Sequence, residues 1–176
     1  MLRTLRLSPD DARAILAYDR EVFDRYARRI RRLPWRQASR RRGIGHESLF
    51  DTLVHVLNVQ EVWLVYLVRG RNRELARLFR DPSRHPTDWT GFATYARRVW
   101  TEVDRTAASF TPRVLARSCH APWMPGRSTV RDAVLQVTLE EAHHLGEVIG
   151  ALWQDDVRPP EMTWMDVGRA LAARRA

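Results

Sequence analysis

Three residues with metal-ligating side chains fall on predicted apolar helix faces: His55, Glu140 and His144. Glu140 and His144 are four positions apart, so on a helix they share a face, with roughly 5–6 Å between their Cβ atoms. His55 lies between Val54 and Val56 in an apolar run, where a buried imidazole needs a polar partner. We therefore predict that His55, Glu140 and His144 together hold one divalent metal ion.

Two histidines and one carboxylate form a ligand set that leaves coordination positions open. Structural zinc sites close all four positions, whereas catalytic sites keep one for water or substrate. Bound water at such a position has a lowered pKa, and a thiolate or carbonyl of a substrate could take its place. The sequence identifies no catalytic residue beyond these predicted ligands.

Other interpretations of the same residues stay open. A single histidine on an apolar face is often a hydrogen-bonded core residue, and Glu140–His144 could be a plain helix-surface pair. Glu140 with His143 matches the Glu-x-x-His element of di-iron proteins, but that element must occur twice and has no second copy here. His143 is predicted to contact a ligating residue rather than the metal, or to lie on the surface, and His46 and His85 are assigned no role.

The elements that must position these residues are helices. Capping residues and three-and-four apolar spacing predict four long helices, and the second is apolar nearly all round, as expected of a helix in the middle of a molecule. Shorter helices are predicted at 74–79 and 163–174, and no segment is a confident strand. The four long helices are expected at 9–33, 48–68, 90–110 and 129–153. The predicted fold class is therefore all-α, a four-helix bundle with short extra helices.

Length and composition indicate one cytoplasmic domain. A chain of 176 residues with 44% hydrophobic residues can bury a core as a single domain, 1–176. The longest apolar run, Val62 to Val68, is too short to span a bilayer, and the start carries no signal-peptide pattern. The single cysteine, Cys119, excludes an internal disulfide and fits a reducing compartment.

The charge of +9 comes from 30 basic residues, all of them arginine, against 21 acidic residues. The arginines are densest between Arg25 and Arg42, which could indicate a nucleic-acid surface. The sequence has no base-reading motif or interleaved aromatic residues beside them. We therefore expect a solvated helix end and loop there rather than a nucleic-acid partner.

Three segments resemble the DinB/YfiT-like family of metal-dependent enzymes. They are Ala17-Tyr18-Asp19-Arg20-Glu21-Val22-Phe23-Asp24, the helix that starts at Ser48 and contains His55, and Glu140-Glu141-Ala142-His143-His144-Leu145-Gly146-Glu147-Val148. The resemblance implies a helical bundle in which His55 and His144 are metal ligands. The family's third histidine corresponds to Glu140 here, and Leu145 and Glu147 stand where the family often has Arg and Gln.

This resemblance also implies partners and a class of chemistry. The cofactor would be one divalent metal per chain, zinc or nickel first, with iron or manganese as alternatives. Relatives include transferases that use low-molecular-weight thiols, an isomerase and hydrolase-like members, and they often form homodimers. The first hypothesis is thus a metal-dependent enzyme that activates a small thiol or water. The alternatives are a non-catalytic metal-binding stress protein and, third, a basic nucleic-acid binder.

Overall fold

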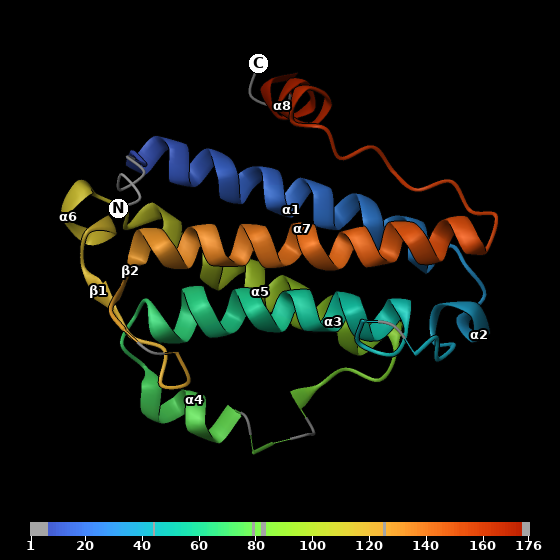
Figure 1. Ribbon diagram of the computed structural model, residues 1–176, viewed down its shortest axis with the longest axis horizontal. Helices are drawn as coiled ribbons and strands as arrows, with labels where there is room; N and C mark the ends of the chain where they lie inside the picture. The colour runs from blue at the N-terminus through green and yellow to red at the C-terminus, as the bar shows by residue number, and fades with distance from the viewer. Residues whose placement is uncertain (1–6, 44, 79, 82–83, 125, 174–176) are drawn as a thin grey trace.

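The computed structural model describes residues 7–173 except 44, 79, 82–83 and 125. Four long helical segments form the bundle, and the order of neighbours around it is α1, α7, α3 and α5 (Figure 1). They are α1 (Pro9–Arg31), α3 (Leu49–Gln60) continued by η1 (Glu61–Leu67), α5 (Trp89–Ala108) and α7 (Val130–Gln154). The predicted all-α bundle is confirmed.

Local capping explains where these helices begin. The Ser8 hydroxyl accepts from the Asp11 amide at 3.1 Å, and the Asp11 carboxylate accepts from the Ser8 amide at 3.0 Å. The same reciprocal capping box joins Thr129 and Asp132 at the start of α7. The Ser48 hydroxyl accepts from an amide in the first turn of α3. These caps fix the ends of the two helices that carry His55 and His144.

Smaller elements fill the connections between the bundle helices. The predicted short helices correspond to α4 (Asn72–Leu78) and α8 (Trp164–Ala173). Two further short helices are α2 (Trp35–Ala38), which the sequence patterns did not predict, and α6 (Pro112–Leu115), which Thr111 caps. Two short strands, β1 (Ser118–Cys119) and β2 (Ser128–Thr129), pair antiparallel and close the loop before α7.

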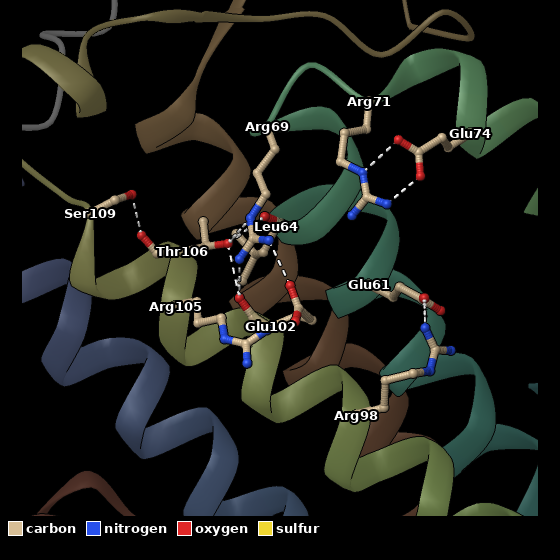
Figure 2. A network of polar contacts seen from close by, with 10 residues as sticks. All are labelled: Glu61, Leu64, Arg69, Arg71, Glu74, Arg98, Glu102, Arg105, Thr106 and Ser109. Carbon is tan, nitrogen blue, oxygen red and sulfur yellow. Dashed lines mark hydrogen bonds and ion pairs between the residues drawn. The ribbon is translucent and has the colours of Figure 1, made fainter.

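The second bundle helix changes its hydrogen bonding halfway along. In η1 the amide of Val68 bonds the carbonyl of Trp63, five residues back, so the helix widens into a π-helical turn. Side chains of the neighbouring helix satisfy its polar groups: the Thr106 hydroxyl lies 3.1 Å from the Leu64 carbonyl, and Arg98 pairs with Glu61 at 2.6 Å (Figure 2).

The same interface is held at its far end by Arg69. Its guanidinium donates to the Thr106 hydroxyl at 2.9 Å and to the Glu102 carboxylate at 2.6 Å (Figure 2). These bonds join η1 to α5 along their length. Within the described residues, no helix is long and apolar enough to cross a membrane.

Candidate metal centre

Two predicted ligands from distant parts of the sequence lie side by side in the bundle. The ring centroids of His55 on α3 and His144 on α7 are 4.6 Å apart. His144 is 8% exposed and His55 is half-buried. The structure therefore brings together the two histidines that the resemblance implied as ligands.

A third imidazole, which the sequence patterns left without a role, completes the cluster. His46 stacks on His55 with a centroid separation of 3.4 Å and lies 4.9 Å from His144. One ring nitrogen from each of the three residues lies within 4.8 Å of the others. His46, His55 and His144 are hereafter called the three-histidine cluster.

The turn that carries His46 has an unusual backbone. Gly45 before it and Glu47 after it both have positive φ, 54° and 75° respectively. Glycine adopts this conformation without steric cost. At Glu47 the same conformation is sterically unfavourable because of the Cβ atom. The Arg42 amide bonds the Glu47 carbonyl at 2.7 Å and closes the turn. Glycines at 43 and 45 directly before a histidine were the sequence signal for this turn.

An acidic residue one turn along α7 orients His144. The Nδ1 atom of His144 lies 2.8 Å from Oε2 of Glu147. When this nitrogen carries the proton, Nε2 presents its lone pair for a metal, as in many carboxylate–histidine–metal arrangements. Glu147 was one of the positions at which this chain departs from the family pattern.

Glu140, the third predicted ligand, lies at the edge of the cluster. Its Oε2 is 3.4 Å from Nε2 of His144, and its Oε1 accepts from Gln136 at 2.7 Å. Its carboxylate thus faces Nε2, the ring nitrogen that is left for an ion when Glu147 contacts Nδ1. Glu140 is not a member of either group of three potential ligands that the described residues form; the second group is His143, His144 and Glu147.

The surroundings of His46 and His55 favour the neutral form of these two imidazoles. Burial, together with the neighbouring His46 and His144, lowers the pKa of His55 to about 3. Burial and His144 also lower the pKa of His46. Neutral imidazole is the form that binds metal, so His46 and His55 disfavour protons and keep their nitrogen lone pairs for a cation.

The donor set fits one divalent ion. Nitrogen ligands at the 2.0–2.1 Å typical of zinc lie about 3.3 Å apart in a tetrahedron, so a cluster within 4.8 Å needs only a small contraction. Three imidazoles leave the fourth position open. Zinc and nickel both bind imidazole nitrogen readily. If Glu140 were also a ligand, its carboxylate oxygen would make the donor set more suitable for a harder cation such as manganese.

A hydrogen-bonded carboxylate holds the loop that bears His46. Asp155, at the end of α7, pairs with Arg40 and with the buried Arg42, and accepts from Gln37 at 3.0 Å. Arg41 pairs with Glu47 at 2.8 Å. Several arginines of the basic segment therefore have structural partners.

Comparison with known families supports the same reading of the chain. A family model described as the DinB superfamily matches residues 18–148, well over half of the sequence. The matched span includes His46, His55, Glu140 and His144. No curated protein matches the chain.

Proposed function

Since the chain belongs to the DinB superfamily, we propose that it is a metal-dependent enzyme that binds one divalent cation and activates a low-molecular-weight thiol or water for transfer or hydrolysis. The observation that carries this proposal is the three-histidine cluster, whose nitrogens approach within 4.8 Å from three separate segments. Zinc or nickel is the expected metal because all three donors are imidazoles.

The residues around the cluster have separate roles in this proposal. His46, His55 and His144 would hold the cation, which when bound would act as a Lewis acid on a thiol or water in the open position. Glu147 holds His144 through Nδ1. Glu140 Oε2 lies 3.4 Å from the His144 ring nitrogen and is placed to accept a proton at the open position.

Gln136 restricts how Glu140 can move. Its amide nitrogen donates to Glu140 Oε1 at 2.7 Å, which leaves Oε2 as the atom that faces His144. A carboxylate held in this way can take a proton at one defined oxygen. This arrangement gives Glu140 a role as a base even where it is not itself a ligand.

Metal content tests the first half of the proposal. Purified protein is loaded with Zn²⁺ or Ni²⁺, desalted and measured by elemental analysis, with about one equivalent expected. His55→Ala and His144→Ala should each lose most of the metal, while the exposed His85→Ala serves as the matched control. Retention below about a tenth of an equivalent in the wild type would falsify the proposal.

Three further variants identify the ligands. If the three-histidine cluster binds the ion, His46→Ala loses metal, and His143→Ala keeps it. If the ligand set predicted from sequence is correct, Glu140→Ala loses metal, and His46→Ala keeps it. Titration of each variant with Zn²⁺ by calorimetry distinguishes the two sets.

Glu140, which stands where the family has its third histidine, favours a second candidate function, a non-catalytic metal-binding bundle. The hollow between the His46 turn and α7, lined by Glu47, Thr52 and Glu147 among others, has a volume of about 10 Å³. This is at most the space of one water molecule. The hollow is therefore too small for a substrate, and none of the three clustered histidines lines it.

Turnover assays with several thiols and electrophiles decide between the two candidates. Activity that disappears both on metal removal and in His144→Ala supports the enzyme. Full metal occupancy without turnover of any pair supports the non-catalytic bundle. The homodimer implied by the resemblance remains a prediction, which light scattering can test.

A further inference from the structure

We propose that a pocket at the C-terminal end of α1 binds a small ligand that carries two or more phosphate groups. Five arginines and two prolines line it, and none belongs to the three-histidine cluster. The pocket, hereafter the arginine pocket, has a volume of about 390 Å³ and is lined by Arg25, Arg28, Arg29, Arg32, Arg158 and Pro159–Pro160.

Helical spacing places four of these arginines together. Arg25, Arg28, Arg29 and Arg32 follow the i, i+3, i+4, i+7 pattern of a single helix face. Like charges at i and i+4 destabilise a helix, so this pattern has a cost in the free protein. An anion bound across the face would remove that cost.

Tertiary contacts bring the fifth arginine to the same place. The segment after α7 turns back along α1 toward α8 (Figure 1). It is fastened by three bonds to backbone carbonyls: Tyr26 to Pro160 at 3.2 Å, Arg29 to Arg158 at 3.1 Å and Arg25 to Glu161 at 3.1 Å. The second wall of the pocket is therefore held in position, more than a hundred residues away in sequence.

Acidic neighbours neutralise only part of this charge. Glu21 accepts from Arg25 at 3.0 Å and lies 3.9 Å from Arg28. The pocket lining itself contains five arginines and no carboxylate. The Arg28 side chain is 56% exposed, and Arg32 and Arg158 are also exposed, so their guanidinium groups can reach a ligand.

The chemistry of the walls selects the ligand class. Guanidinium groups bind phosphate through paired, charge-assisted hydrogen bonds, and several of them match several phosphates. The volume lies in the range of small-molecule sites. No aromatic side chain for base stacking is among the lining residues, which are five arginines and two prolines. A compact oligophosphate therefore fits better than a nucleic-acid strand.

Calorimetry with tripolyphosphate and orthophosphate at low salt tests the proposal. We expect tripolyphosphate to bind at least about tenfold more tightly than orthophosphate, because it spans more guanidinium groups. R28Q/R32Q should weaken tripolyphosphate binding by at least about tenfold. The charge-matched control R97Q/R113Q changes two exposed arginines on α5 and α6 and should leave binding within about twofold.

Several outcomes would overturn the proposal. One is the absence of tripolyphosphate binding; another is an equal loss in R28Q/R32Q and R97Q/R113Q, which would mean that only net charge matters. A third is tighter binding of a single-stranded oligonucleotide that is lost in the same pocket variant, which would make this surface a nucleic-acid interface. R158Q, in the segment outside the helices, repeats the test without altering α1. Metal content is measured in parallel, because the histidine site is independent of this pocket.

Discussion

Oε2 of Glu147 lies 2.8 Å from Nδ1 of His144, and the same oxygen would lie 2.6 Å from a Cβ atom built on Gly45. The carboxylate is thus confined between a potential metal ligand and the backbone of the turn that presents His46. This contact couples the turn to α7. It also makes residues 45 and 147 sensitive to substitution, although neither is a predicted ligand.

Removal of this carboxylate should weaken metal binding without removing a ligand. For Glu147→Ala we expect a loss of about 10–100-fold in zinc affinity, the usual effect of losing a partner that orients a ligating histidine. Glu147→Gln keeps an acceptor oxygen and should lose less. Competition titration with a chelator measures both, with the exposed Glu161→Gln as control. Equal affinity in wild type and Glu147→Ala would contradict an orienting role.

Two glycines in the same turn provide a matched pair. Gly43 and Gly45 both have positive φ, 66° and 54°, so alanine introduces backbone strain of about 1 kcal/mol at either position. Only at Gly45 would the new methyl group collide with Glu147. We expect Gly45→Ala to lower metal affinity and Gly43→Ala to lower stability alone. Calorimetric titration and thermal unfolding separate the effects, and identical affinities would exclude the coupling.

Acid should release the metal and destabilise the apo-protein. Because the pKa of His55 is lowered from 6.5 to about 3, the unfolded chain gains a proton there at a higher pH than the folded chain. The contribution of neutral His55 to the free energy of unfolding is therefore fully present above pH 6.5, and it is lost as the pH falls from 6.5 toward 3. His55→Gln should flatten this decline in thermal unfolding of the apo-protein, whereas the exposed His85→Gln should not. An unchanged pH profile in His55→Gln would be inconsistent with a buried neutral imidazole.

A buried acid pair between α1 and α7 predicts the opposite pH dependence. Burial raises the pKa of Asp19 from 3.8 to about 7, and burial next to Asp19 raises that of Glu141. The unfolded carboxyl groups ionise at lower pH than the folded ones, so stability present below pH 3.8 is lost as pH rises toward 7.

Substitution of Asp19 by asparagine tests this acid pair. The Thr138 hydroxyl lies 2.7 Å from the Asp19 carboxylate. Asp19→Asn keeps an acceptor oxygen for this hydroxyl and removes the negative charge. We expect a melting temperature several degrees higher than wild type at pH 8, and little change at pH 4. The exposed Asp10→Asn on the same helix is the control. A lower melting temperature at pH 8 would show that the charge of Asp19 stabilises the fold.

The ion pair at the end of α7 should matter for both stability and metal binding. The Arg42 side chain is 6% exposed, and Asp155→Ala removes the carboxylate that pairs with its guanidinium. The loss of one partner from a buried ion pair costs about 3–5 kcal/mol of stability. The exposed Asp104→Ala, which breaks the pair with Arg20, should cost at most about 1 kcal/mol. Denaturant unfolding compares them. We also expect weaker zinc binding in Asp155→Ala, because Arg42 closes the turn that carries His46.

The sequence alone determined the helices and two of the clustered residues. Caps such as Ser8 with Asp11, and apolar spacing along each segment, are local signals, so the four long helices and their bundle were predicted. The pair Glu140–His144 followed from helical geometry, because residues four apart share a face. His55 was identifiable because it interrupts an apolar helix.

Only the tertiary structure decided which side chains meet. His46 lies in a turn whose backbone is set by positive φ at Gly45 and Glu47, and no periodic pattern projects a loop residue into a site. Arg158 joins the arginines of α1 because the chain folds back after α7 and is held by backbone carbonyls there. Helical propensity acts over one or two turns, whereas these contacts depend on packing between segments that are distant in the sequence, such as those of Arg29 and Arg158, 129 residues apart.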